Sequence, residues 1–353
     1  MTEEKQLILN MLKEGKITVE EASDLLEAIG DKKSPINDFT GKISSTVDSI
    51  LKKATETISA FDIDTSFDLS NIPNYNLKGE INSHKDMRVD DEIEKINIDV
   101  VNGNIVVEKN QEPGIIISAD VYAKQANLED FIEVEIKDGI LNIEENNDYS
   151  ETGASVNLKV SLGSDFYEKL FIDTINAKVE VCDVDFENLE INSVNGKITL
   201  INLKSNIDID NVNGKVDIKN VEGDVRIDNI SGSIYLADIK GEIIDVDNIS
   251  GNIRVDSLKS KSLKAETKSG SIRLYNIDGS KEIDLETISG TLVIDTNNYK
   301  GQIRAFAEGP SVNVTDKFVN KIKTDEGYEI STSNTDTDLE IRARASSGKI
   351  SIR

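Results

Sequence analysis

The sequence predicts a mainly β protein, a β-solenoid of stacked coils preceded by a small α-helical N-terminal module. Three observations support this fold class. A twelve-residue unit recurs along the chain, with 18 to 20 residues between consecutive starts from residue 170 to residue 283. Apolar and polar residues alternate within each unit, whereas the first 30 residues show helical spacing instead. A fixed period of this size is typical of a solenoid or repeat array.

Residues 1–31 have the pattern of a short helical hairpin. Apolar residues recur at helical spacing on both sides of the sequence EGK, which interrupts the pattern. Thr18 and Glu21 have the S/T-x-x-E spacing of a capping box at the start of the second expected helix, and Gly30 stands where a C-terminal cap belongs. So short a segment has little core of its own. We therefore expect its apolar faces to bind a protein partner or a second copy of the chain.

Residues 32–91 are expected to be a linker that contains an amphipathic helix at about 41–61. This helix could lie on a membrane surface or pack on its own protein. Lysines and acidic residues are mixed on its polar face, which favours packing but leaves peripheral membrane contact open. His84, the only histidine, falls in the linker and is expected to be solvated.

Residues 92–353 form the predicted solenoid, with the most regular coils at about 168–300. In the unit Ile207–Ile218, two strands of alternating polarity flank the corner sequence DNVNG. Copies at residues 96–107 and 341–352 stand apart from the regular array. Residues 108–167 and 301–340 are expected to be irregular terminal coils, because the ends of a solenoid must be blunted.

Two architectures fit this unit. Asn-Gly between alternating strands is a strong hairpin signal, which would give an antiparallel meander. A meander, however, needs a period of only one strand and one turn, whereas here the two halves of the unit keep different sequences. Coils stacked about 4.8 Å apart would also explain why each column repeats one residue type. The pattern therefore favours the solenoid.

The corner positions are predicted to form a structural ladder of polar side chains and glycines. Stacked amides can hydrogen-bond from coil to coil, serines can bond the corner backbone, and glycine permits the backbone angles of the turn. The predicted ladder comprises Asn195, Gly196, Asn213, Gly214, Ser231, Gly232, Ser250, Gly251, Ser269, Gly270, Ser289 and Gly290.

A second column is acidic and includes Asp210, Asp228 and Asp247. Rows of carboxylates are ligands for hard cations, so a weak metal hypothesis attaches to these three residues. The alternative is corner capping on a solvated edge. Two charges 4.8 Å apart in water repel by only about 1 kcal/mol, so the row needs no metal. The sequence therefore favours a structural role and predicts no metal or cofactor.

No catalytic set is recognisable, because His84 and the sole cysteine, Cys182, lie in different regions. We therefore do not expect an enzyme, although a glycan-active β-helix enzyme using outward carboxylates remains an alternative. Outward residues that vary between copies form the candidate interaction surface. They are Lys215, Asp217, Arg226, Tyr235, Arg254 and Arg273.

Composition limits the partners and the location. The formal net charge of −26 over 353 residues argues against nucleic-acid binding, which requires cationic surface. One cysteine allows no internal disulfide and fits a reducing compartment. The N-terminus does not have the pattern of a signal peptide, and no window is apolar enough for a transmembrane helix. A cytoplasmic location is expected.

The segment EEKQLILNMLKEGKITVEEASDLLEAI resembles the SHOCT-like helical domain of a bacterial family. In that family it precedes a putative-adhesin β-strand-repeat domain of unknown function. The repeated x-[NS]-G-x-[IV]-x-[ILV] units resemble the repeat domain itself. The resemblance implies a β-solenoid, no known catalysis and a role near the cell envelope or its stress response. The leading hypothesis is thus a non-enzymatic scaffold or interaction protein, and the alternative is an exported surface adhesin.

Overall fold

The computed structural model describes residues 83–123, 128, 130–146, 154–325, 327–333 and 337–353. This part of the chain is mainly β, with 21 strands in one continuous hydrogen-bonded system and no helix. It therefore contains no helix that could span a membrane. The helices expected in 1–31 and 41–61 lie outside the described residues.

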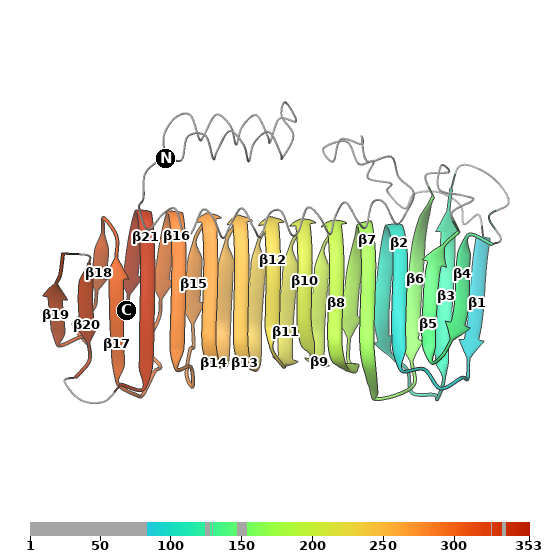
Figure 1. Ribbon diagram of the computed structural model, residues 1–353, viewed down its shortest axis with the longest axis horizontal. Coiled ribbons are helices and arrows are strands. Elements are labelled where there is room, and N and C mark those ends of the chain that lie inside the picture. Colours follow the sequence, from blue (N-terminus) through green and yellow to red (C-terminus); the bar gives the residue numbers. More distant parts are fainter. Residues whose placement is uncertain (1–82, 124–127, 129, 147–153, 326, 334–336) are drawn as a thin grey trace, which may run out of the picture.

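The repeat unit forms one coil of two strands, and successive coils pair in parallel. β10 (Asn206–Asn213) is followed by β11 (Val216–Glu222) and then by β12 (Val225–Ser231). β10 pairs with β12 in parallel, so that Ile207 lies opposite Val225, one repeat further along. A meander would instead have paired consecutive strands antiparallel. The predicted solenoid of stacked coils is therefore confirmed (Figure 1).

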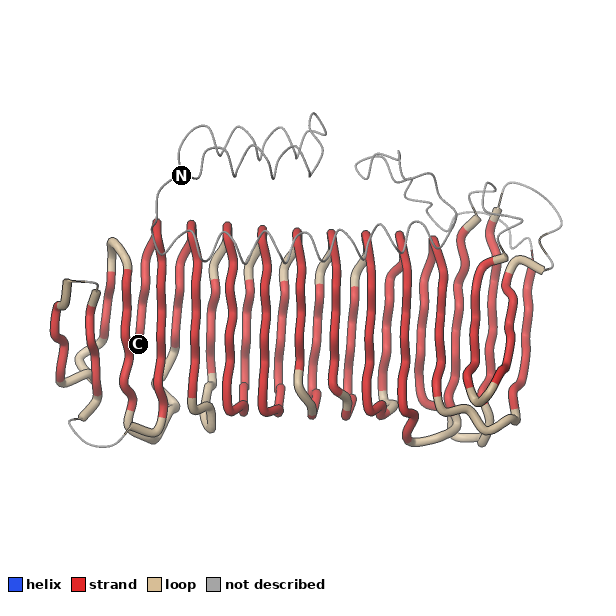
Figure 2. The backbone as a smooth tube through the Cα atoms, viewed as in Figure 1, coloured by secondary structure: helices blue, strands red, loops and turns tan. Residues whose placement is uncertain are grey.

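The regular coils are built from strands that meet at two corners, and some strands run through the second corner without a break (Figure 2). Besides β10 to β12, the strands of the regular coils are β7 (Phe166–Cys182), β8 (Asp185–Asn195), β9 (Ile198–Lys204), β13 (Ile234–Ser250), β14 (Ile253–Ser269), β15 (Ile272–Tyr275) and β16 (Glu282–Ile294).

Two sheets face each other across the core. We call sheet 1 the strands that lead into the Asn/Ser-Gly corner and sheet 2 the strands that leave it. Sheet 1 includes β8, β10, β12 and the second halves of β13 and β14, whereas sheet 2 includes β9, β11, β15 and the first halves of β13 and β14. In β10 and β11 the inward side chains Ile207, Ile209, Val216 and Ile218 are at most 3% exposed. Ile, Val and Leu fill the space between the sheets, as strand alternation requires.

The first and last repeats belong to the same stack, although they are distant in sequence. β2 (Lys95–Lys109) pairs in parallel with β7, and β21 (Leu339–Ile352) pairs in parallel with β16. The segments before β7 and before β21 are therefore excursions that leave the stack and return to it. Each excursion covers one end of the solenoid.

The N-terminal excursion contains β3 (Ile115–Tyr122), β4 (Ile132–Lys137), β5 (Ile140–Glu145) and β6 (Ser155–Leu162). β5 and β6 add one parallel layer to β2, but β4 and β3 then pair antiparallel with them. β1 (Ser83–Val89) completes this end by pairing antiparallel with β3. β1 thus lies inside the range 32–91 that the sequence assigned to a linker.

The C-terminal excursion has the same arrangement of strands. β17 (Ile303–Glu308) and β18 (Val312–Val314) form one parallel layer on β21. β20 (Tyr328–Ser331) then pairs antiparallel with β17, and β19 (Asn320–Lys323) pairs antiparallel with β20. Both irregular regions are thus single coils with antiparallel edges, rather than series of coils. Antiparallel strands at the ends stop further parallel stacking.

The second corner of each coil has a conformation of its own, which the repeat pattern alone does not reveal. One residue per coil adopts the left-handed conformation, with φ between 52° and 57° at Asn202, Asn220, Asp238, Ser257 and Asn276. Asn and Asp tolerate this region better than other non-glycine residues. The Asn220 amide also donates to the Asn202 side-chain oxygen at 2.8 Å. Both corners are therefore specified by the sequence.

Candidate functional site

The predicted corner ladder is present as amide stacking in the first coils. The Asn213 amide donates to Asn195 at 3.2 Å, Asn195 donates to Asn176 at 3.1 Å, and Asn176 donates to Asn102 at 3.0 Å. Ser231 lies in register on Asn213 and continues the column into the later coils. This column binds neighbouring coils to each other, which is a structural task.

The glycines beside this ladder are required by close backbone approach. At Gly232 φ is +136°, and a Cβ atom would lie 1.9 Å from the Gly214 carbonyl oxygen. The Gly232 amide donates to the Ser250 carbonyl at 2.9 Å, so the backbone ladder continues around the corner. Any side chain here would push two coils apart.

A second amide ladder runs inside the solenoid. Asn211 and Asn229 are fully buried and Asn248 is 4% exposed. Asn211 donates to Asn229 at 2.9 Å, Asn229 donates to Asn248 at 3.1 Å, and Asn248 donates to the Gly232 carbonyl at 3.0 Å. Strand alternation from Ile207 and Ile209 places residue 211 inside, so the polar residue at this inward position was the signal that could have revealed it.

The acidic column lies on the outer face of sheet 1 rather than on a solvated edge. Asp210 and Asp228 are each only 4% exposed. The Arg226 guanidinium contacts Asp228 at 2.7 Å, and the Lys264 ammonium contacts Asp247 at 3.0 Å and Glu266 at 3.2 Å. Cations from neighbouring positions therefore cover the carboxylates and stabilise the row.

Burial raises the pKa of several of these carboxyl groups. It raises the pKa of Asp228 to about 6, against the opposing effect of Arg226. Burial, reinforced by the charges of Asp173 and Glu144, raises the pKa of Asp99 to about 7. Burial also raises the pKa of Asp247, partly opposed by Lys264. Asp99 and Asp228 therefore bind protons at a higher pH than an ordinary aspartate does.

The metal hypothesis gains no geometric support on this face. Within the described ranges, no three His, Cys, Asp or Glu side chains converge in a way that could hold a metal ion. Asp210, Asp228 and Asp247 lie in consecutive coils, but the cation beside Asp228 is Arg226 and the cation beside Asp247 is Lys264.

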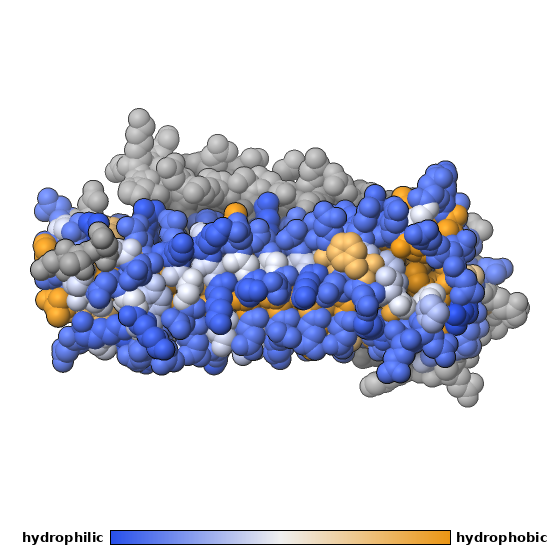
Figure 3. Space-filling model, turned by 90° about the horizontal axis from the view of Figure 1, so that it is seen from below, coloured by the Kyte–Doolittle hydropathy of each residue, from blue (hydrophilic) through white to orange (hydrophobic). Residues whose placement is uncertain are grey.

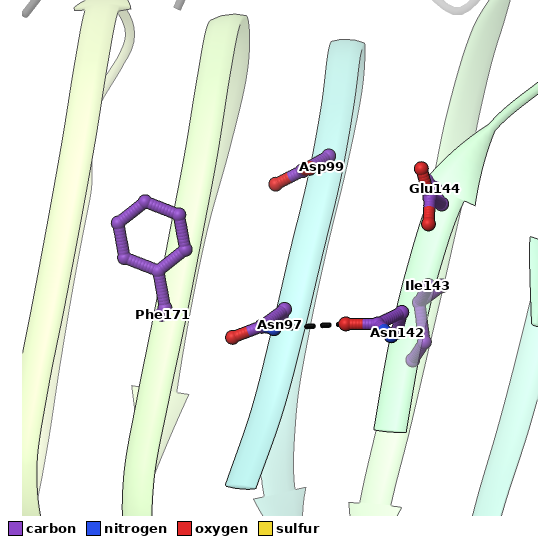
Figure 4. Close-up of a pocket in the computed structure, with 6 residues that line it drawn as sticks. All are labelled: Asn97, Asp99, Asn142, Ile143, Glu144 and Phe171. Carbon is purple, nitrogen blue, oxygen red and sulfur yellow. Dashed lines mark hydrogen bonds between the residues drawn. The ribbon is translucent and has the colours of Figure 1, made fainter. Parts of the chain in front are cut away.

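A small cavity of about 90 Å³ opens on the same face where β5, β2 and β7 lie side by side (Figure 4). Phe171, Asp99 and Glu144 line it, together with Asn97, Asn142 and Ile143. The Asn97 amide donates to the Asn142 side-chain oxygen at 2.8 Å. Because the pKa of Asp99 is about 7, this carboxyl could both accept and donate a proton near neutral pH.

Of the six residues predicted to form an interaction surface, four lie together on sheet 2, and Lys215 lies in the corner beside them. Tyr235 lies opposite Asp217 on one side and opposite Arg254 on the other, and Arg254 lies opposite Arg273. Lys215 contacts Asp217 at 3.2 Å. Arg226 does not belong to this group, because it precedes the Asn/Ser-Gly corner and therefore points outward from sheet 1.

Aromatic rings and cations alternate on sheet 2. The Lys219 ammonium lies 5.6 Å from the Tyr235 ring centre, and the Arg254 guanidinium lies 5.8 Å from Tyr235 and 5.0 Å from Tyr275. We call Lys219, Tyr235, Arg254, Arg273 and Tyr275 the cation–aromatic strip. Figure 3 shows the molecule from below. This side is largely hydrophilic, and a narrow hydrophobic line runs between two hydrophilic rows.

The single histidine and the single cysteine lie far from the strip in the sequence. His84 is in β1, where its Nδ1 atom lies 2.7 Å from Asp120 and its Nε2 atom 2.9 Å from Asp86. The hydrogen bond with Asp120 is the main reason that the pKa of His84 is raised. Cys182 is half-buried, and burial raises the pKa of its thiol.

The fold and its corner sequences define a β-solenoid repeat protein. Residues 207–353 match the domain family described as Toastrack DUF4097, and residues 3–34 match the SHOCT-like domain. The chain therefore matches a SHOCT-like domain followed by a Toastrack domain, in the order that the sequence resemblance predicted. No curated protein matches the chain.

Solved structures provide distant likenesses. A putative adhesin from Bacteroides fragilis has 14% identity and a TM-score of 0.35, and the match covers 76% of this chain and 96% of that protein. A putative adhesin from Parabacteroides merdae has 13% identity and a TM-score of 0.37, with coverages of 76% and 95%. A putative lipid binding protein from Parabacteroides distasonis has 11% identity and a TM-score of 0.31, with coverages of 76% and 96%.

Proposed function

We propose that the protein is a non-enzymatic interaction scaffold whose solenoid presents two binding faces of different chemistry. The observation that carries this proposal is the in-register stacking of outward side chains. It gathers acidic residues on sheet 1 and the cation–aromatic strip on sheet 2. Parallel ladders hold such rows at fixed spacing, so a partner meets a preformed surface and little ordering is needed on binding.

The N-terminal SHOCT-like region is proposed to mediate association, either with a partner or with a second copy. The support is its match to residues 3–34, a segment too short for a large core of its own. The mass of the full chain in solution should be compared with that of a chain lacking residues 1–30. A larger assembly is expected for the full chain only, and identical monomers without a partner would contradict the association.

Charge reversal on each face tests the scaffold proposal. One variant carries Asp245→Lys on sheet 1, and the other carries Arg254→Glu with Arg273→Glu on sheet 2. Each full-length chain is purified from the native cells, its β content is checked by circular dichroism, and co-purifying proteins are compared by mass spectrometry. We expect one variant to lose a partner that the other retains. If both variants retain every partner of the unchanged chain, neither face is the recognition surface.

A role in the cell-envelope stress response, with a cytoplasmic location and peripheral membrane contact through residues 41–61, is part of the same proposal. An exported surface adhesin is the alternative. Fractionation of native cells separates the two, because an adhesin would be found outside the cell and a cytoplasmic scaffold inside it. Native protein confined to the cytosolic fraction would remove the adhesin alternative.

The cavity beside Asp99 gives a specific reason to test a glycan-active enzyme as a third candidate. Asp99 and Glu144 lie opposite each other on neighbouring strands, with Phe171 beside them. Paired carboxylates of which one is protonated near neutral pH are the groups that glycoside hydrolysis uses. The full chain should be screened for polysaccharide cleavage with and without Ca²⁺. Cleavage that is lost in Asp99→Asn would favour the enzyme over the scaffold.

A further inference from the structure

The cation–aromatic strip crosses four consecutive coils near the centre of sheet 2. Lys219 is in β11, Tyr235 in β13, Arg254 in β14, and Arg273 with Tyr275 in β15. Parallel neighbours lie about 4.8 Å apart, so the strip extends along the solenoid axis rather than forming a pit. A ligand that fits this shape is itself extended.

The strip has more positive charge than its own acids neutralise. Arg254 contacts Asp256 at 3.4 Å, with a single guanidinium nitrogen. Within the described part of the chain, the Arg273 side chain has neither an ion pair nor a hydrogen bond. A guanidinium presents a planar set of donors that matches a carboxylate with two parallel hydrogen bonds. Two such groups in consecutive coils, in a chain of net charge −26, point to an anionic ligand.

The tyrosines hold Arg254 in place and offer a second kind of contact. Arg254 lies within 6 Å of both ring centres, a distance at which rings and guanidinium groups attract. Both rings remain partly exposed and have an apolar body with a polar hydroxyl. One side of a sugar ring presents C–H groups, and a tyrosine ring can pack against them. The strip therefore combines an aromatic surface on which a sugar can stack with guanidinium groups that can bind carboxylates.

The position of the strip argues against a peptide or a nucleic acid. The strands of the strip are paired on both sides, so their backbone groups are already used and a peptide cannot add as a further strand. Duplex DNA carries one charge per about 1.7 Å, far more than a few cations could neutralise. An acidic polysaccharide with one carboxylate per sugar ring has a lower charge density. The acidic face lies across the core, about 10 Å away, and is largely screened at physiological salt.

We propose that the cation–aromatic strip binds an anionic polysaccharide whose sugar rings carry carboxylate groups. The sugar rings pack on the exposed part of Tyr275, since cations lie beside Tyr235 on both neighbouring strands, and the carboxylates bind the guanidinium groups of Arg254 and Arg273. The proposal rests on the proposed function, because it assigns a ligand class to one face of the non-enzymatic scaffold.

The test uses the full chain and polygalacturonate, a polymer of carboxylate sugars, with binding measured by isothermal titration calorimetry. Methyl-esterified polygalacturonate keeps the sugar rings but removes the charge, and poly-L-glutamate keeps the carboxylates but removes the rings. We expect binding to polygalacturonate that is at least about tenfold tighter than to either control polymer, because only it engages both kinds of contact.

The variants distinguish the contribution of the planar guanidinium group from that of its positive charge. Arg254→Lys retains the charge but removes the bidentate geometry, and Tyr275→Ala removes one ring; each is expected to weaken binding about tenfold or more. Arg226→Ala removes an exposed arginine from sheet 1 and should leave binding unchanged. Circular dichroism of each variant establishes that it is folded.

Three outcomes would overturn the proposal: no binding of polygalacturonate, equal binding of poly-L-glutamate, or equal weakening by Arg226→Ala. Equal binding of poly-L-glutamate would instead identify an acidic peptide as the ligand. None of these outcomes removes the scaffold function, because a protein partner bound through sheet 1 would still be lost in the Asp245→Lys variant. Loss of no partner in either charge-reversed variant, by contrast, would remove the scaffold function itself.

Discussion

Asn229 shows how a polar residue can be an interior building block in this fold. Its side chain is fully buried, yet it accepts a hydrogen bond from Asn211 and donates one to Asn248. A buried amide without partners would be costly, but a column of identical amides supplies each one with a partner from the next coil. The column thereby links coils through the core as well as through the backbone.

Replacing Asn229 should destabilise the protein by an amount that depends on whether the new side chain can still form a hydrogen bond. Asn229→Ala leaves Asn211 and Asn248 without their partner and should lower the free energy of unfolding by about 2 kcal/mol. Asn229→Thr should cost less, because Thr267 and Thr287 occupy the same column and bond glycine carbonyls at 3.3 Å. Urea unfolding followed by circular dichroism measures both changes. Equal losses for the two variants would show that the ladder is not the cause.

Gly232 should be equally sensitive, for a steric reason. In Gly232→Ala the new Cβ would lie 1.9 Å from the Gly214 carbonyl oxygen at a φ of +136°. We expect the free energy of unfolding to fall by about 2 kcal/mol or more. Ser233→Ala, at the exposed neighbouring position, is the matched control and should change little. A Gly232→Ala chain as stable as this control would contradict the close coil contact.

At the scale of the strand, sheet 1 concentrates charge that only neighbouring coils can balance. Lys264 in β14 contacts Asp245 and Asp247 in β13 and Glu266 in its own strand, at 3.0 to 3.2 Å. These carboxylates are partly or largely buried, so the lysine reduces a repulsion that water cannot screen well. The ammonium is the cation on which this part of the row depends.

Lys264→Met should therefore destabilise the protein in a pH-dependent way. Burial raises the pKa of Asp247 and of Glu266, and Lys264 opposes both shifts. Without the lysine both pKa values rise further, so the acids are charged without a partner at pH 8 but take up protons towards pH 5. We expect a loss of about 2 kcal/mol in the free energy of unfolding at pH 8, and a smaller loss at pH 5.

Thermal or urea unfolding of this variant at the two pH values makes the comparison. Lys261→Met removes a lysine of the same strand whose ion pair with Glu242 is exposed. Exposed pairs contribute little, so this control should show almost no loss at either pH. A Lys264→Met loss that did not shrink between pH 8 and pH 5 would mean that the carboxylates are not the cause.

The strands themselves could be predicted from the sequence, but the environment of their outward residues could not. Alternation around Ile207 and Val216 identifies strands and core without any knowledge of neighbours. The burial of Asp228, by contrast, depends on Arg226 and on the coils above and below. The sequence pattern groups Arg226 with Tyr235 because both point outward, although the corner between them places them on opposite sheets. The cation–aromatic strip likewise needs Tyr275, which has no special place in its own repeat unit.

At the scale of the whole molecule, the stack is continuous from β2 to β21, and the two excursions cover its ends. The sequence showed copies of the unit at residues 96–107 and 341–352, but it could not show that they stack directly on the regular array. That information lies in long-range pairing rather than in local pattern. Exposed parallel edges favour association with further strands, so the antiparallel caps keep the stack finite.

A finite stack of equivalent coils should tolerate the loss of one whole coil. Residues 225–243 span one repeat, because Val225 and Ile244 occupy equivalent positions in register. Deleting these 19 residues joins Asp224 to Ile244, so β10 can pair with the second half of β13 and Asn211 can meet Asn248. In a quasi-one-dimensional protein each coil contacts only its neighbours, so the remaining coils keep their interfaces.

We expect this deletion to yield a folded protein with a parallel β spectrum by circular dichroism and a slightly smaller urea m-value. Deleting residues 225–234 should instead prevent folding, because it places the sheet 2 half of β13 directly after β11, where a sheet 1 strand belongs. The whole-coil deletion also removes Tyr235 and places Asp217 next to Arg254, so it should weaken polygalacturonate binding while leaving the solenoid intact. If the whole-coil and half-coil deletions behaved alike, the coils would not be the independent units that their register indicates.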